Sequence, residues 1–222
     1  MRKPVIAIDG YSSTGKSSIS KIIAHQLGIV HLDTGALYRG ITYFAIKNCI
    51  SEDGSINLEN LFQRFDEITL EFKQVEDELI VLLNGTDISK EIRANEVSQQ
   101  VSLIARQKEV RDFLLDKQRK IAANGGVIMD GRDIGTIILP NADYKFFLTA
   151  SIDERTKRRF LELQKLGIET DEATVRKNLV ERDRIDSERE VAPLKQADDA
   201  IIIDNTALTK KETIDLILSH IS

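Results

Sequence analysis

Residues 4–18 read PVIAIDGYSSTGKSS, and this stretch decides the fold class. Residues 5–9 form a short apolar, β-branched run that is typical of a buried strand, and Gly10 ends it. Gly10 to Ser18 then matches the pattern G-x-x-x-x-G-K-[ST], and a helical pattern runs from Lys16 to Leu27. A strand, a glycine-containing loop and a helix in this order predict a phosphate-binding loop. Its backbone N–H groups and the positive end of the helix dipole would face phosphate oxygens.

The predicted contacts of this loop with a nucleotide come from nine consecutive residues. They are Gly10, Tyr11, Ser12, Ser13, Thr14, Gly15, Lys16, Ser17 and Ser18. Lys16 would reach the β- and γ-phosphates, and the Ser17 hydroxyl would bind Mg²⁺. The alternative, a plain glycine turn that opens a helix, is disfavoured because the pattern and its strand–helix context agree.

The rest of the chain alternates between apolar strand patterns and helical patterns. Further strands are expected at 29–32, 127–129, 144–148 and 200–203, and helices at 35–49 and, as one long element, at 95–123. This alternation predicts an α/β domain with a mainly parallel sheet.

Residues 51–92 break the alternation. Residues 68–72 alternate apolar and polar side chains, residues 79–83 are apolar, and Asn84-Gly85 is a hairpin turn signal. We expect a small antiparallel sheet here, in a subdomain inserted into the core. Residues 167–171 form a turn between two charged helical segments and are a second candidate for a mobile cover.

Composition narrows the function classes. The 222 residues carry a net charge of −5, which argues against bulk nucleic acid as the main partner. Cys49 is the only cysteine, so no disulfide can form within the chain. No signal-peptide core or membrane-spanning segment is apparent, so we expect a cytoplasmic protein. His25, His31 and His220 are isolated in sequence, which favours structural roles.

Charged residues follow the predicted strands. Asp130, after the strand at 127–129, is placed to orient a Mg²⁺-bound water or an acceptor, and Asp33-Thr34-Gly35 follows the second strand in the same way. Six arginines lie near strand ends or the 167–171 turn, where guanidinium groups can bind a phosphoryl group. They are Arg39, Arg132, Arg155, Arg158, Arg182 and Arg189. No N-K-x-D pattern of a guanine-specific switch is present.

Residues 181–190, ERDRIDSERE, divide by helical spacing. Arg182, Asp186 and Arg189 stand at i, i+4 and i+7 and share one face, so we expect them at the site, with Asp186 paired to Arg182. The other charged residues, among them Arg184 and Glu188, are expected to form ordinary surface ion pairs.

Four stretches together resemble the bacterial cytidylate kinase family, within the nucleoside monophosphate kinase group. They are GYSSTGKSS (10–18), DTGALYR (33–39), DGRDIGT (130–136) and REVAPL (189–194). The resemblance implies a P-loop NTPase three-layer fold with a five-stranded parallel sheet, an antiparallel β insertion that binds the nucleoside monophosphate, and a short lid. It places the whole chain, residues 1–222, in one kinase domain. The core would cover about 1–50, 93–150 and 187–222, the insertion about 51–92, and the lid with its flanking helices about 151–186.

The resemblance also implies the reaction and the roles of residues. ATP with Mg²⁺ would donate its γ-phosphoryl group to CMP or dCMP. Apart from the resemblance, we expect a monomer without nucleic-acid or membrane partners. Lys16, Arg132, Arg158 and Arg189 would stabilise the migrating charge, with Asp130 positioning Mg²⁺ water or the acceptor. The acceptor phosphate would contact Arg39, Arg132 and Arg189. The base would contact Ser102, Arg111 and Asp133, and the sugar would contact Arg182 and Asp186. Thr34 would also contact the acceptor, and Arg155 and Arg158 would close on ATP.

Some questions stay open at this stage. Ser102 and Arg111 stand nine positions apart, so either they approach the base from different directions or the helix is interrupted between them. Tyr11 and Ser13 stand where the family commonly has Pro and a small residue. The alternatives in function are a kinase for another acceptor, such as UMP, AMP or shikimate, and a nucleotide-binding switch with low turnover.

Overall fold

A computed structural model describes residues 3–75 and 78–221 and divides into two compact units. The core unit consists of Met1–Leu32 together with Arg119–Ser222, and the inserted unit consists of Asp33–Gln118. The inserted unit extends beyond the expected insertion at 51–92 on both sides. The assignment of residues to core, monophosphate-binding insertion and lid stays a prediction.

The core unit is built on a five-stranded parallel sheet, as expected. Its strand order is β2-β6-β1-β7-β8. The strands are β1 (Val5–Gly10), β2 (Val30–Asp33), β6 (Val127–Gly131), β7 (Tyr144–Thr149) and β8 (Ile201–Asp204). All six residues of the central strand β1 are buried. Ile8 is in register with Asp130 on β6, so the loop that follows β1 and the carboxylate at the end of β6 lie at the same edge of the sheet.

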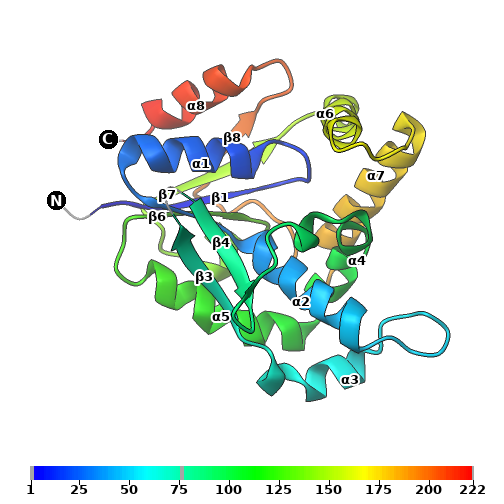
Figure 1. Ribbon diagram of the computed structural model, residues 1–222. Coiled ribbons are helices and arrows are strands. Elements are labelled where there is room, and N and C mark those ends of the chain that lie inside the picture. Colours follow the sequence, from blue (N-terminus) through cyan, green and yellow to red (C-terminus); the bar gives the residue numbers. More distant parts are fainter. Residues whose placement is uncertain (1–2, 76–77, 222) are drawn as a thin grey trace. The chain divides into compact units, whose positions relative to one another are not determined.

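Four helices of the core unit follow its strands along the chain. They are α1 (Lys16–Leu27), α6 (Ile152–Lys165), α7 (Glu172–Glu188) and α8 (Lys210–Ser219). Helices α1 and α8 pack side by side along the sheet (Figure 1). Between β6 and β7, Ile134–Ile138 forms a single π-helical segment, η3.

Helices α6 and α7 form a hairpin around the turn at 167–171. Gly167 has a φ of 70°, a left-handed conformation that glycine adopts without a steric penalty. Leu163, Val175 and Leu179 form a small buried cluster between the two helices. The turn between two charged helices is therefore confirmed.

The inserted unit is mainly helical, with a three-stranded antiparallel sheet of order β3-β4-β5. Its helices are α2 (Thr34–Asn48), α3 (Leu58–Gln63), α4 (Asn95–Ala105) and α5 (Lys108–Ala122), with 3₁₀ turns η1 (Phe65–Glu67) and η2 (Glu91–Arg93). Its strands are β3 (Leu70–Val75), β4 (Glu78–Leu83) and β5 (Thr86–Asp87). Asn84 and Gly85 both have positive φ, 50° and 79°, and join β4 to β5, which confirms the turn and the antiparallel sheet.

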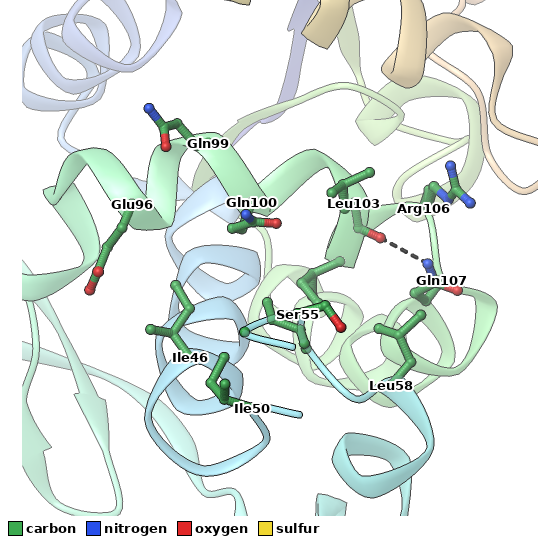
Figure 2. A pocket seen from close by; sticks show the side chains of 13 residues that line it. Ile46, Ile50, Ser55, Leu58, Glu96, Gln99, Gln100, Leu103, Arg106 and Gln107 are labelled. Carbon is green, nitrogen blue, oxygen red and sulfur yellow. Dashed lines mark hydrogen bonds between the residues drawn. The ribbon is translucent and has the colours of Figure 1, made fainter. Parts of the chain in front are cut away.

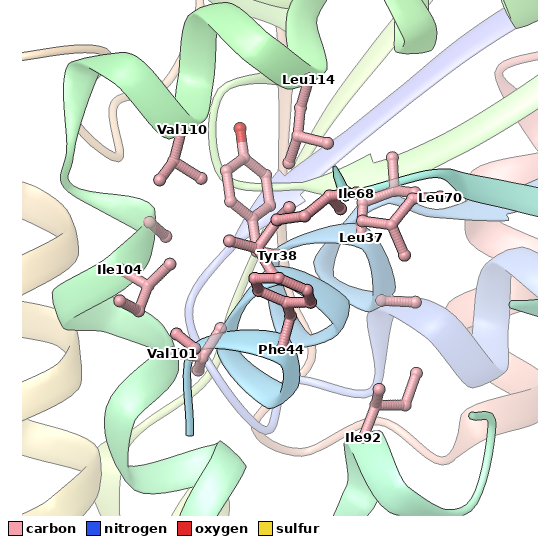
Figure 3. Packing of buried hydrophobic residues seen from close by; sticks show 14 of the residues in the cluster. Leu37, Tyr38, Phe44, Ile68, Leu70, Ile92, Val101, Ile104, Val110 and Leu114 are labelled. Atoms are coloured by element: carbon pink, nitrogen blue, oxygen red, sulfur yellow. The ribbon is translucent and has the colours of Figure 1, made fainter. Parts of the chain in front are cut away.

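The core of the inserted unit forms around α2. Leu37, Tyr38 and Phe44 of α2 are buried against Val101 and Ile104 of α4 (Figure 3). Further buried side chains of this cluster come from α5, from η2, from β3 and from the residues just before β3. They include Val110 and Leu114 of α5, Ile92 of η2, and Ile68 and Leu70. The cluster holds α4 and α5 against α2 by apolar burial.

The prediction of one long helix over 95–123 is wrong, because the chain breaks between α4 and α5 at Arg106 and Gln107. The Arg111 side chain donates a hydrogen bond to the Ala105 carbonyl (3.0 Å), a group that an uninterrupted helix would satisfy from its own backbone. The apolar spacing continues across the break, so it could not reveal it. The open question about Ser102 and Arg111 is thus decided: the two residues lie on separate helices.

Candidate functional site

The phosphate loop takes its shape from residues with positive φ. Gly10 has a φ of 144°, and a Cβ on it would lie 2.0 Å from the Leu148 carbonyl oxygen, so only glycine fits. Gly15 has a φ of 88° immediately before α1. Ser13, one of the two departures from the family pattern, also adopts a left-handed conformation, with a φ of 61°. The loop therefore curls although Ser13 carries a side chain.

Lys16 lies inside the loop. Its Nζ donates to the Tyr11 carbonyl (2.6 Å) and to Thr14 Oγ1 (3.4 Å), and 6% of the residue is exposed. Burial, followed by the charge of Arg132, lowers the pKa of Lys16 well below its ordinary value. An anion that contacts Nζ would offset both effects, as expected of a lysine that binds phosphate.

Tyr11, the other departure, connects the loop to α6. Its ring packs edge-on against Phe147, with ring centroids 5.8 Å apart, and the Arg155 guanidinium lies 5.1 Å from its centroid. Arg155 also donates to the Ser12 carbonyl (3.4 Å) and to Asp183 on α7 (2.5 Å). The guanidinium thus links the phosphate loop, α6 and α7.

Arg158 reaches the loop through an intermediate residue. It donates to the side-chain and main-chain oxygens of Asn205 at 3.0 and 2.9 Å, and Asn205 Nδ2 donates to the Thr14 carbonyl at 2.9 Å. The two arginines expected to close on ATP, Arg155 and Arg158, are therefore both connected to the loop. A contact with ATP itself stays a prediction.

Asp130 lies at the end of β6 between two polar side chains. Its carboxylate accepts a hydrogen bond from Ser17 Oγ (2.6 Å) and contacts His31 Nε2 (2.6 Å), and 3% of Asp130 is exposed. A hydroxyl and a carboxylate are oxygen donors suited to Mg²⁺, which protein groups hold in small number together with substrate phosphates. No group of three or more His, Cys, Asp or Glu side chains suited to a metal occurs within residues 3–75 and 78–221.

Two arginines and two aspartates form a cluster beside the loop, in which Arg132 is half-buried and the other three residues are buried. Arg132 Nε donates to Asp186 (2.9 Å) and Arg132 Nη2 to Ser12 Oγ (2.8 Å). Arg189 donates to Asp133 (3.3 Å) and lies 3.9 Å from Asp186. Asp133 and Asp186 are 2% and 4% exposed. With Ser12 of the loop, five predicted site residues from three segments therefore meet within the core unit.

The structure confirms that residues 181–190 divide into a more buried side and an exposed side. Asp186 and Arg189 are buried and Arg182 is half-buried, whereas Arg184 is exposed and pairs with Glu181 and Glu188. The Asp186 carboxylate accepts a hydrogen bond from Arg132, a partner that was not expected, and the pair of Asp186 with Arg182 stays a prediction. Helical spacing describes one helix only and could not reveal a partner that arrives from β6.

Four predicted residues belong to the inserted unit. Arg39 of α2 donates a hydrogen bond to Asp33 (2.7 Å), the residue just before this helix. Thr34, the first residue of α2, is 2% exposed. Ser102 on α4 is 3% exposed. Arg111 is 6% exposed, and its guanidinium lies 5.2 Å from the centroid of the Tyr38 ring. Within this unit the helix break after α4 allows Arg111 to turn back onto the end of α4.

The inserted unit also carries a pocket of about 550 Å³ (Figure 2). Its lining comes from the end of α2, the 54–58 segment and α4 with the following turn, and includes Ile46, Ile50, Leu58, Gln100, Leu103 and Gln107. Neither Ser102 nor Arg111 lines it. The pocket is therefore separate from the predicted base-reading residues.

Sequence reasoning missed four polar residues of the core unit site: Asp9, His31, Asp183 and Asn205. Asp9 accepts hydrogen bonds from the backbone N–H groups of Ile134 (2.8 Å) and Gly135 (2.7 Å), and burial raises its pKa to about 7 against the opposing effect of these two bonds. His31 could have been found from its position two residues before Asp33 on the same strand, because residues two apart on a strand place their side chains on one face. For Asp183 and Asn205 no sequence signal was available, because their partners are distant in the chain.

Comparisons with known proteins agree with this geometry. The family model described as cytidylate kinase matches residues 6–222. A cytidylate kinase of Geobacillus sp. (strain WCH70) is 46% identical over 217 residues, which cover 98% of this chain and 96% of the relative. A cytidylate kinase of Bacillus cytotoxicus is 44% identical over 217 residues, which cover 98% of this chain and 95% of the relative. A solved structure of an uncharacterized protein from Eubacterium ventriosum shares the fold alone, with a TM-score of 0.51 at 14% identity over 99% of this chain and 98% of the other. On the family model and these relatives, the chain belongs to the cytidylate kinase family.

Proposed function

We propose that this chain transfers the γ-phosphoryl group of ATP to CMP or dCMP, giving ADP and CDP or dCDP. The family match and the names of the relatives support the reaction class. The observation that carries the proposal is the contact of Arg132 with both Ser12 of the phosphate loop and Asp186, since one guanidinium then borders the donor loop and the predicted acceptor residues.

On the donor side, the residues of the phosphate loop bind and orient. Backbone N–H groups of the curled loop and the N-terminus of α1 would hold the phosphate oxygens, and Lys16 Nζ would exchange the Tyr11 carbonyl for a phosphate. Ser17 and Asp130 would hold Mg²⁺, directly and through its water. When bound, this ion would supply positive charge that neutralises the charge developing on the transferred phosphoryl group.

On the acceptor side, two arginines of the cluster supply positive charge. Arg132 and Arg189 would hold the acceptor phosphate and stabilise the transferred group, which carries its charge on three equatorial oxygens. Both guanidinium groups are already oriented by aspartates, so little reorganisation is needed when substrate binds. Asp130 would also help to orient the attacking phosphate.

The remaining contacts rest on the family motifs. Asp133, Ser102 and Arg111 would read cytosine, which presents an exocyclic amine donor and a ring-nitrogen acceptor where uracil presents the opposite pair. Arg182 and Asp186 would bind the sugar, and Thr34 and Arg39 the acceptor, with Arg39 on its phosphate. Arg155 and Arg158 would close on ATP and exclude water, which otherwise competes as acceptor. A monomer in the cytoplasm without nucleic-acid partners stays a prediction.

The test is a coupled assay of ADP release with ATP and Mg²⁺, with CDP identified by chromatography. We expect CMP and dCMP to turn over faster than UMP, AMP or shikimate. Arg189→Ala should lower kcat/KM for CMP by about 10²- to 10³-fold, as loss of one charge-stabilising donor does. Arg184→Ala is the matched control, because Arg184 lies on α7 five residues away, is exposed and pairs only with surface glutamates in the described structure. Faster turnover of another acceptor, slow ATP hydrolysis without CDP, or a fully active Arg189→Ala would each contradict the proposal.

A further inference from the structure

The His31–Asp130–Ser17 contacts point to a function for a histidine that no motif includes. His31 lies on β2, Asp130 on the neighbouring strand β6, and Ser17 in the first turn of α1. His31 Nε2 is 2.6 Å from Asp130 Oδ1, and Ser17 Oγ is 2.6 Å from Asp130 Oδ2. Each carboxylate oxygen therefore contacts a different side chain, and the three residues come from three separate elements.

This arrangement fixes the plane of the Asp130 carboxylate. A carboxylate held at one oxygen can still rotate about its χ2 torsion, whereas one held at both oxygens cannot rotate without losing a hydrogen bond. The side chain of Asp130 is 4% exposed and that of His31 is 17% exposed, so water competes little for the contact. The 2.6 Å separation from a carboxylate indicates that Nε2 carries the proton and donates it.

The orientation passes on to Ser17. A hydroxyl has one proton and two lone pairs, and here the proton is directed at Asp130 Oδ2. The lone pairs of Ser17 Oγ are therefore left for a cation. If Asp130 turned away, the Ser17 hydroxyl would be free to rotate and its lone pairs would no longer have a fixed direction.

We propose that His31 is a positioning residue for the metal-binding pair: it holds Asp130, and Asp130 in turn orients the Ser17 hydroxyl. This inference rests on the proposed function in that Ser17 and Asp130 serve Mg²⁺–nucleotide binding. It assigns His31 no contact with substrate. It predicts that the loss of His31 weakens the metal-dependent part of nucleotide binding and leaves the metal-free part intact.

The test compares His31→Leu with His31→Gln, whose amide nitrogen stands at about the place of Nε2 and can donate to Asp130. Calorimetry measures the Kd of ATP with Mg²⁺ and with EDTA for the full chain. In the wild type, Mg²⁺ should tighten binding. We expect His31→Leu to reduce this tightening by about tenfold, the usual effect of losing an outer partner of a metal ligand. His31→Gln should restore most of it, and the exposed His25→Gln on α1 should change nothing.

Steady-state kinetics provide the second measurement. His31→Leu should lower kcat by about tenfold at fixed Mg²⁺, because the metal-binding pair loses its fixed orientation. Thermal unfolding checks that each variant folds, and His31→Met replaces the leucine variant if that one does not. Equal weakening of ATP binding with and without Mg²⁺, or no rescue by glutamine, would overturn the inference. A wild type that makes no CDP would instead overturn the proposed function, so the two failures are distinguishable.

Discussion

Replacing Asp9 by Asn tests how the buried carboxylate of β1 affects stability. Asp9 is 4% exposed, and its two oxygens accept the N–H groups of Ile134 and Gly135. Burial raises the pKa of Asp9 to about 7 from 3.8, with Asp133 adding to the rise and the two backbone bonds and Lys16 opposing it. Asn keeps the size of the side chain and removes its titration.

The sign and size of the effect follow from proton linkage. Between about pH 4 and pH 7 the folded chain keeps a proton on Asp9 that the unfolded chain has released, so raising the pH favours unfolding. The stabilisation from this carboxyl is fully present below about pH 4 and is lost as the pH passes about 7. The wild type should therefore lose up to about 1.4 kcal/mol per pH unit relative to Asp9→Asn in this window, or about 2 kcal/mol between pH 5 and pH 7, where the slope falls as Asp9 ionises.

Urea unfolding of both proteins at half-unit steps from pH 5 to pH 8 and fixed ionic strength measures this difference. Asp171→Asn is the control. Asp171 is exposed, and its pKa is lowered by bonds from the backbone and side chain of Thr174, so its contribution is lost only in acid and the difference should stay constant above pH 5. A pH-independent difference for Asp9→Asn would refute the reasoning. So would a wild type that gains stability relative to Asp9→Asn as the pH rises, since the two N–H donors would then outweigh burial.

Three further predictions concern elements that support the site. Gly10→Ala should lower the free energy of unfolding by at least about 3 kcal/mol in urea titrations, because the added Cβ would lie 2.0 Å from the Leu148 carbonyl oxygen. An unchanged urea midpoint of unfolding would contradict this. Asp183→Asn removes the charge of the half-buried partner of Arg155 and should cost about 2 kcal/mol by the same measurement and raise KM for ATP; a change in KM for CMP alone would argue against a link to the donor loop. Thr209→Ala removes the capping box of α8 and should cost about 1 kcal/mol in thermal unfolding with unchanged kcat; Thr209→Ser should restore the stability.

The parts of the fold that sequence could predict are those governed by local rules. The strand and loop at residues 4–18, the Asn84-Gly85 turn and the turn near Gly167 depend on residue type and short spacing. The break after Ala105 does not, because it depends on Arg111 reaching back to a carbonyl six residues earlier. Apolar periodicity alone cannot distinguish one helix from two that share a buried face.

The site shows the same limit. Lys16, Ser17 and Asp130 could be placed from a loop pattern and a strand end, and the structure brings Ser17 and Asp130 together. Asp186 was expected at the site from spacing, yet its partner Arg132 lies 54 positions away in sequence. His31 was taken as structural because an isolated histidine carries no pattern, although the order of strands puts it beside Asp130.

The order of strands also sets the timing of assembly. β1 is the first element of the chain, but both of its neighbours in the sheet, β6 and β7, follow the inserted unit, and Asp9 bonds a residue 125 positions later. At about 5–20 residues per second, roughly 6–25 s pass on the ribosome before β6 emerges. During this interval Asp33–Gln118 can complete its own apolar cluster, while a six-residue apolar strand has neither neighbour. The nascent phosphate loop therefore lacks a scaffold until late in synthesis, and β1 is the segment we expect a chaperone to shield.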